Sequence, residues 1–360
     1  MLKLRDLLKN TMLSKMELVI ENANLDTVVT NVGVVDYEFD ISDNVEKDFN
    51  QSEFLISSML VAKNDEEKFY EIIKKLIEMK TCSIAIKKVY YDKLPEKVYH
   101  LARQHNYPIF MYDDELTFED VIYEVLYEIK KIERINYYQQ VIDNLLSDFF
   151  TNQKAFELLN IDNEDHYIFA LKVCEEFNIS ILKNANLKIF EYYDSYIIFA
   201  TMSRGLEYYR SYFEDILKGY DYYIGISYLE IDLKIALKRS IDNLKLAKFL
   251  EQPIVTFNEI NFLYVVIDNY QNEDYQKYMN TYLMDVFDDQ QLLDTLINYV
   301  RYEGNIKKCA KEMYVHENTI RYRVNKAHEL LERNSSELEF YKSLSLAITI
   351  YALTNSDFVI

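Results

Sequence analysis

The sequence predicts two α/β domains joined by a long helix and followed by an all-α C-terminal domain. Short β-branched runs alternate with amphipathic helical patterns in residues 1–117 and again in residues 165–258, which is typical of sheets covered by helices. The segment 291–353 shows helical patterns alone. Because the 360 residues include only 5 Gly and 3 Pro, collagen-like, low-complexity and turn-rich all-β classes are excluded.

The region 1–117 is predicted to be one α/β domain. In its clearest helix, apolar residues occupy one side while Lys and Glu occupy the others. Pro95 suits the first turn of a further helix. Helices are predicted over residues 4–16, 65–80 and 94–106, and strands over residues 18–23, 28–37, 52–62, 82–88 and 107–113.

Residues 118–150 are predicted to form one amphipathic helix. Apolar residues recur at steps of four and three, and the phase slips by one residue after Ile132. A seam of this length resembles a dimerising linker helix, a coiled coil between two copies. A helix packed on its own domain explains the pattern equally well. The apolar positions are Phe118, Ile122, Val125, Ile129, Ile132, Ile135, Tyr138, Ile142, Leu145 and Phe149.

The middle region, residues 151–265, is predicted to be a second α/β domain. Strands are expected over residues 166–173, 187–193, 195–202, 222–229 and 253–257, and helices over residues 204–218 and 230–251. An apolar stripe marks the second helix. It consists of Leu233, Ala236, Leu237, Ser240, Leu244 and Ala247.

The composition limits the classes of partner and chemistry. A net charge of −20 repels nucleic acid and anionic membranes, so a nucleic-acid site has to be a local basic surface. No apolar run reaches the length of a membrane span, and the N-terminus has no signal-peptide core, so we expect a soluble cytoplasmic protein. Neither a nucleophile arrangement, a metal-ligand spacing nor a phosphate-binding glycine loop is present. We therefore expect no catalytic residues, no metal and no cofactor.

A basic segment stands out in this acidic chain. Between Arg301 and Lys326 lie seven Lys and Arg residues and only three acidic ones. A short helix is predicted after Asn305 and a second helix from Glu317, with a brief turn between them. Small Ala310 in the first helix allows the second to approach closely. This arrangement predicts a helix-turn-helix within residues 285–355, whose second helix enters the major groove of DNA.

The face of the second helix opposite its apolar stripe carries the residues that suit DNA. Asn and Arg side chains read adenine and guanine edges, while Thr, Tyr and Lys suit phosphate contacts. His316 is placed to cap the helix, where phosphate is also favoured. The predicted DNA-contacting residues are His316, Asn318, Thr319, Arg321, Tyr322, Arg323, Asn325, Lys326 and, on the first helix, Lys307.

These residues resemble a known family. The segment 292–331, LLDTLINYVRYEGNIKKCAKEMYVHENTIRYRVNKAHELL, is similar to the C-terminal helix-turn-helix of the PucR/CdaR family of bacterial transcriptional regulators. The shared features are Thr295–Leu296, Gly304–Asn305, Ala310 and the run VHENTIRYRV at 315–324. One residue departs from the pattern, because Glu317 stands where the family usually has Arg. Its carboxylate favours the helix N-terminus but repels nearby phosphate.

The rest of the chain resembles the same family in the same order. Residues 4–36 and 94–126 are similar to the start and the end of its PucR-type sensory domain, and residues 222–248 to its degenerate GGDEF-like middle domain. A working cyclase hairpin needs glycines for close approach of the nucleotide. The segment 191–195 reads EYYDS and has none, so nucleotide cyclisation is not expected.

The resemblance implies a ligand-responsive, DNA-binding transcriptional regulator rather than an enzyme. Its expected partners are a double-stranded DNA operator, a small-molecule effector and a second copy of the chain in a homodimer. Activation of catabolic genes, for example for purine or amino-acid use, is the role that the family suggests. Two alternatives are a nucleotide-processing enzyme that uses the middle domain, and an adaptor whose helical end binds another protein.

Overall fold

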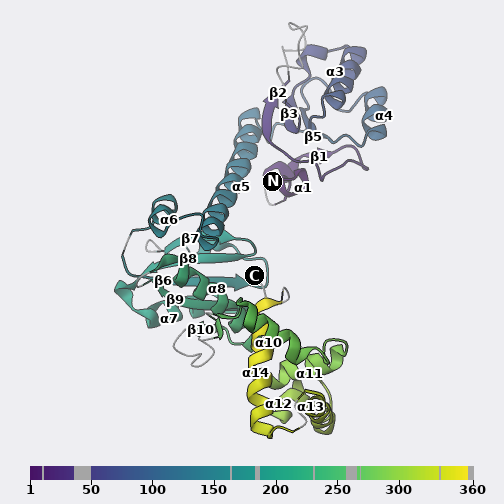
Figure 1. Cartoon of the computed structure of the whole chain (residues 1–360). Coiled ribbons are helices and arrows are strands. Elements are labelled where there is room, and N and C mark those ends of the chain that lie inside the picture. Colours follow the sequence, from purple (N-terminus) through teal and green to yellow (C-terminus); the bar gives the residue numbers. More distant parts are fainter. Residues whose placement is uncertain are drawn as a thin grey trace. The chain divides into compact units, whose positions relative to one another are not determined.

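The computed structural model describes residues 1–9, 12–35, 50–162, 164–182, 187–229, 232–256, 266–267, 269–331 and 334–355. The chain forms two compact units, Met1–Tyr137 and Tyr138–Ile360 (Figure 1). Each unit contains a five-stranded sheet, and the second unit also contains the C-terminal helices. The predicted fold class, α/β in the N-terminal and middle parts and all-α at the C-terminal end, is confirmed.

The sheet of the first unit has the strand order β1-β5-β4-β3-β2, in which β2 to β5 are parallel and β1 is antiparallel. One face is covered by α3 and α4, and the other by the N-terminal helices and the start of α5. The elements are α1 (Leu4–Leu7), the 3-10 helix η1 (Met12–Lys15), β1 (Glu17–Leu18), β2 (Asn31–Val34), β3 (Glu53–Ser57), η3 (Leu60–Ala62), α3 (Glu66–Glu78), β4 (Ser83–Lys87), α4 (Glu96–Gln104) and β5 (Ile109–Tyr112).

Several predicted elements of this unit differ from the structure, and of the strand expected over residues 18–23 only Leu18 lies in a strand. The helix expected over residues 4–16 is replaced by α1 and η1, with residues 10 and 11 outside the described part. The strand expected over residues 52–62 stops at Ser57, because the Ser57 hydroxyl accepts a hydrogen bond from the Met59 backbone N–H at 2.8 Å. Met59 itself adopts the left-handed conformation, which turns the chain out of the strand.

Helix α5 (Phe118–Leu146) ends four residues before its predicted end. Asp148 adopts a left-handed conformation, and the N–H groups of Phe149 and Phe150 both return to the Asn144 carbonyl. Val121, Val125 and Ile129 are buried in the core of the first unit. Val141, Ile142 and Leu145 are buried in the second. The apolar pattern of α5 therefore shifts by one residue between the part that packs in the first unit and the part that packs in the second.

The sheet of the second unit has the order β10-β9-β6-β8-β7. Its inner strands are antiparallel, and β10 is parallel to β9. One face packs against α7, and the other against α6, α8 and the end of α5. The elements are α6 (Asn152–Leu159), β6 (His166–Val173), η4 (Ile179–Leu182), β7 (Leu187–Tyr192), β8 (Ser195–Thr201), η5 (Met202–Arg204), α7 (Leu206–Ile216), β9 (Tyr222–Leu229), α8 (Leu233–Leu250) and β10 (Ile254–Thr256).

The C-terminal helices share a hydrophobic core with the middle sheet's helix α8. Phe249 at the end of α8 is buried together with Leu293 and Ile297 of α11 and Leu353 of α14. The predicted stripe of α8 is buried as expected. The helices are α10 (Glu273–Leu283), α11 (Gln290–Arg301), α12 (Ile306–Glu312), α13 (Glu317–Leu331) and α14 (Glu337–Thr354). Within the described residues, no helix is both long and apolar enough to cross a membrane.

Candidate nucleic-acid interface

Local sequence signals place α12 and α13 as two short, separate helices. Gly304 ends the preceding segment with φ +77, and a Cβ there would lie 3.4 Å from the Tyr299 hydroxyl. The Asn305 side chain then accepts a hydrogen bond from the Lys308 N–H and caps α12. Tyr314, with φ +53, turns the chain between the two helices. The result is the predicted helix-turn-helix.

The cap on α12 leads to a stability prediction. Replacing Asn305 by alanine removes the acceptor for the Lys308 N–H and is expected to lower the free energy of unfolding by about 1 kcal/mol. Urea unfolding followed by circular dichroism measures the change. Serine at the same position keeps an acceptor oxygen, so Asn305→Ser should lose only a few tenths of that amount. Equal losses in the two variants would contradict the capping role.

Helix α13 packs on α11 and α12 through its apolar stripe. Ile320, Val324 and Ala327 are buried, and Ala310 of α12 is buried against them. This contact fixes which side of α13 faces outward. These buried residues follow the steps of four and three residues that the sequence predicts for the stripe.

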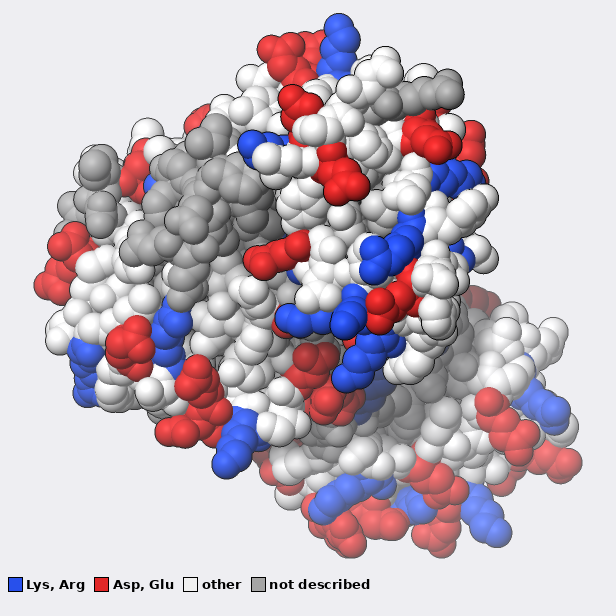
Figure 2. All heavy atoms as spheres, turned by 90° about the horizontal axis from the view of Figure 1, so that it is seen from below, with Lys and Arg blue, Asp and Glu red and all other residues white. Residues whose placement is uncertain are grey.

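The opposite face of α13 is open to solvent. Asn318, Arg321, Tyr322 and Asn325 are exposed, and Tyr322 is 70% exposed. Figure 1 places α12 and α13 at the lower end of the second unit. Seen from below, Figure 2 shows a group of neighbouring Lys and Arg side chains with acidic side chains around it. Exposed amide and guanidinium groups on one helix face are the groups that hydrogen-bond to base edges.

Further predicted residues lie at the N-terminus of α13 and on α12. His316 lies just before α13, and its Nδ1 accepts a hydrogen bond from the Asn318 N–H at 3.1 Å. Glu317 is the first residue of α13 and is half-buried. Thr319 is half-buried, and Lys307 is exposed on α12. The structure thus places eight of the nine predicted residues on two adjoining helices and His316 directly before the second one.

Besides His316, two of these nine side chains form hydrogen bonds within the protein. Arg323 donates to Thr295 Oγ1 and to Gln291 Oε1, both at 3.1 Å, and so ties α13 to α11. Lys326 Nζ lies 2.8 Å from Asp289 Oδ2. Asp289 also caps α11 by accepting from the Leu292 N–H. Sequence reasoning missed these partners, because only the fold brings residues 289–295 next to α13.

The ion pair between Asp289 and Lys326 shifts both pKa values in the direction that keeps it charged. The hydrogen bond from Lys326 lowers the pKa of Asp289, and the same bond raises the pKa of Lys326. A lowered carboxyl pKa means that the stabilisation is present at neutral pH and is lost as the pH falls through that pKa. The raised pKa of the Lys326 ammonium means that the same stabilisation is lost at high pH only when the pH rises through the pKa of Lys326. The pair therefore persists through the neutral range.

If Lys326 contacts phosphate as the sequence predicts, this pair competes with that contact, and Asp289→Asn is expected to strengthen DNA binding. The amide keeps an acceptor for the Leu292 N–H, but it removes a negative charge from the interface and frees the ammonium. We expect the affinity for a duplex at low salt to rise about twofold to fivefold, as measured by fluorescence anisotropy. A loss of affinity would show that Asp289 supports the interface instead of opposing it.

Metal binding and cysteine chemistry have little support in the described part of the chain. No group of three or more His, Cys, Asp and Glu side chains there could hold a metal ion. Burial raises the pKa of Cys82 to about 12 and that of Cys309 to about 11. Both are therefore held as thiols, which are poor nucleophiles and metal ligands.

Comparisons with known proteins agree with this geometry. The purine catabolism regulatory protein-like family matches residues 6–129, and the PucR C-terminal helix-turn-helix domain matches residues 292–350. A purine catabolism regulatory protein of Bacillus subtilis (strain 168) is 36% identical over 85 residues, which are 22% of this chain and 16% of that protein. The chain thus matches about a sixth of the length of this curated relative.

Among solved structures, a regulator of polyketide synthase expression from Bifidobacterium adolescentis is similar at 16% identity and a TM-score of 0.29, over 59% of this chain and 91% of that one. The two family models lie at opposite ends of the chain and together match about half of it. The chain carries both parts in the order that its sequence predicts, and it belongs to the PucR family of transcriptional regulators.

Proposed function

We propose that this protein regulates transcription by binding a double-stranded DNA operator through α13. The protein acts as a homodimer, and each copy places α13 in the major groove of one half-site. A small-molecule effector controls the binding. The regulated genes are catabolic genes that the protein activates. The family description and the name of the curated relative both support purine catabolism as the pathway.

The observation that carries this proposal is the outward face of α13. Its exposed Asn318, Arg321 and Asn325 lie opposite a buried stripe, so the helix is held rigidly while its reading groups remain free of the core. Preorganised donors and acceptors at this spacing match the edges of successive base pairs. The proposed contacts of Lys307, Thr319 and Tyr322 are to phosphate.

The dependence of binding on salt tests the proposal. Labelled duplexes that cover the intergenic regions beside the gene are titrated with the full chain at several salt concentrations. If the bound homodimer neutralises about four phosphates in total, the affinity should fall about 100-fold between 50 and 200 mM salt. An adaptor that binds another protein would show no such dependence for any duplex. Weak, salt-independent retention of all duplexes would overturn the proposal.

The middle domain has a supporting role in this proposal. The hairpin that joins β7 and β8 carries Tyr192 and Tyr193, whose hydroxyls donate to Asp143 Oδ1 and Oδ2, both at 2.8 Å. These bonds tie the hairpin to the end of α5. We assign the domain a structural and dimer-forming role without nucleotide cyclisation. Incubation with GTP and Mg²⁺ checks this assignment, since product formation would favour the enzyme alternative.

A further inference from the structure

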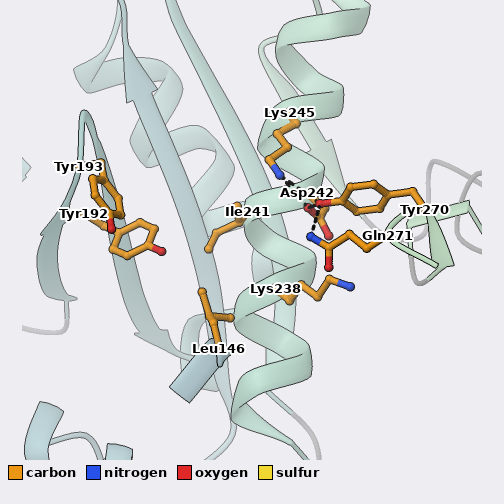
Figure 3. A pocket seen from close by; sticks show the side chains of 9 residues that line it. All are labelled: Leu146, Tyr192, Tyr193, Lys238, Ile241, Asp242, Lys245, Tyr270 and Gln271. Atoms are coloured by element: carbon orange, nitrogen blue, oxygen red, sulfur yellow. Dashed lines mark hydrogen bonds and ion pairs between the residues drawn. The ribbon is translucent and has the colours of Figure 1, made fainter. Parts of the chain in front are cut away.

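A cavity of about 280 Å³ lies in the second unit, over one face of α8 (Figure 3). Its floor consists of Lys238, Ile241, Asp242 and Lys245, which follow the spacing of one helix face. The hairpin residues Tyr192 and Tyr193 form one wall, and Tyr270 and Gln271 form the other. The cavity therefore has an apolar, aromatic side and a polar, charged side.

The polar side contains a buried carboxylate whose bonding is incomplete. Asp242 is 1% exposed, and its Oδ1 accepts from Lys245 Nζ at 3.3 Å and from the Tyr270 hydroxyl at 3.0 Å. Its second oxygen, Oδ2, has no hydrogen-bond partner within the described residues. Burial raises the pKa of Asp242, which shows that the surroundings disfavour its charge. Buried polar atoms in native proteins normally have a partner, so this oxygen marks a position for one.

The rest of the lining is already held in place. Gln271 Nε2 donates to the Tyr270 hydroxyl at 3.2 Å, and Lys245 Nζ donates to the same oxygen at 3.1 Å. Lys238 lies over the Tyr270 ring. On the other wall, both tyrosine hydroxyls are fixed by Asp143. A lining that is fixed before binding loses little conformational freedom when a ligand enters.

We infer that this cavity binds a small, planar organic molecule that has an N–H donor beside a carbonyl acceptor. The N–H group donates to the unpaired Oδ2 of Asp242, a residue of the cavity lining. The carbonyl accepts from Lys238. The ring packs between Ile241 and the hairpin tyrosines. This inference rests on the proposed function, in which it supplies the site of the effector.

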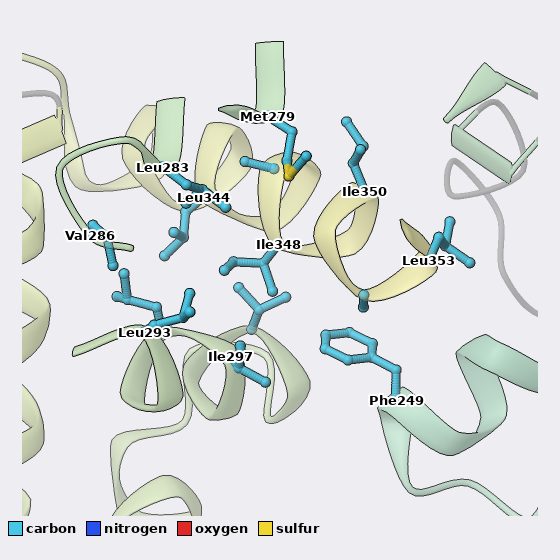
Figure 4. Packing of buried hydrophobic residues seen from close by; sticks show 14 of the residues in the cluster. Phe249, Met279, Leu283, Val286, Leu293, Ile297, Leu344, Ile348, Ile350 and Leu353 are labelled. Atoms are coloured by element: carbon cyan, nitrogen blue, oxygen red, sulfur yellow. The ribbon is translucent and has the colours of Figure 1, made fainter. Parts of the chain in front are cut away.

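The position of the cavity gives it a direct connection to the DNA-binding helices. Helix α8 continues from the cavity to Phe249, whose carbonyl accepts from Arg301 Nε at 2.6 Å. Arg301 also pairs with Glu251 at 2.6 Å. Figure 4 shows Phe249 pointing from α8 toward the core that contains Ile297 and Leu353. Tyr270 of the cavity wall belongs to the same core.

The test uses the full chain and the matched probes 2-pyridone and N-methyl-2-pyridone. The first has the N–H donor beside its carbonyl, and the second has a methyl group instead. Saturation-transfer NMR should show 2-pyridone binding at least about tenfold more tightly than its N-methyl analogue, because a hydrogen bond to a charged group is lost. Equal binding of the two probes, or no binding of either, would overturn the inference.

Two variants locate the binding. Asp242→Asn should weaken 2-pyridone binding about tenfold, while the same change at exposed Asp274 on α10 should have no effect. If Asp242→Asn does not fold, Tyr193→Ala replaces it, because this side chain is 60% exposed and its loss opens one wall. Unchanged binding in the folded variant would also overturn the inference.

The same samples separate this inference from the proposed function. Duplex binding by anisotropy is measured on the protein without a probe. If duplexes bind and 2-pyridone does not, the cavity inference alone fails. If 2-pyridone binds at Asp242 and no duplex does, the cavity is a ligand site and the DNA-binding proposal fails.

Discussion

Replacing Arg321 by alanine is expected to weaken binding to the operator about tenfold to a hundredfold. Arg321 is exposed on the outward face of α13. A bidentate contact between an arginine and a guanine edge discriminates against the wrong base by about 1–3 kcal/mol. Asn318→Ala, one turn earlier on the same helix, should have an effect of similar size. Both side chains lie away from the buried stripe, so folding should not change.

Anisotropy titrations with specific and scrambled duplexes measure this effect. The loss should be larger for the operator than for scrambled DNA, because a base contact carries sequence information and a phosphate contact does not. Arg103→Ala on α4 and Asn280→Ala on α10 are matched controls at exposed positions. Operator affinity that stays unchanged in both interface variants would refute the site assignment.

The largest expected effect on stability comes from Gly225→Ala. Gly225 lies in β9 directly beneath α8, and a Cβ there would lie 2.1 Å from the Leu244 backbone N and 2.2 Å from the Ser240 carbonyl O. Both contacts are with backbone, so no side-chain rotation relieves them. The helix would have to move away from the sheet. We expect a loss of at least about 4 kcal/mol, which is a large part of the stability of a typical domain.

Chemical unfolding compared with Gly219→Ala measures this effect. Nothing lies within 4 Å of a Cβ at Gly219, but its φ of +94 strains an alanine. That control should therefore lose only about 1–2 kcal/mol. If the two variants lose the same free energy of unfolding, close packing of α8 on β9 is not what makes Gly225→Ala destabilising. Retained secondary structure with lost cooperativity would show that α8 has separated from the sheet.

Much of this fold follows from periodicity in the sequence. Strands β6 and β9 coincide with their predicted ranges, because buried runs with clear turns on either side leave little choice of register. The spacing of Ile320, Val324 and Ala327 likewise determined which face of α13 is outward. These features depend on neighbours in sequence, which a single sequence contains.

Features that depend on distant residues were not predictable in the same way. The burial of Asp242 and Lys245 did not follow from the helical pattern, and Tyr270, which comes after β10 in the chain, forms hydrogen bonds with both of them. The partners of Arg323 and Lys326 come from α11 and from its N-cap residue Asp289, on the far side of α12 in the sequence. Helix α10 was missed because its acidic composition gave a weak apolar pattern. The predicted DNA contacts, the domain boundaries at residues 265 and 285, and the homodimer stay predictions.

The core that joins α8 to α11 and α14 affects how an operator can be read. Because Phe249 packs in this shared core and its carbonyl accepts a hydrogen bond from Arg301, the described residues of α11 to α14 are held against α8. In a symmetric dimer of such chains, the protein itself fixes the distance between the two copies of α13. Inserting half a helical turn of DNA between the half-sites would rotate one of them out of reach.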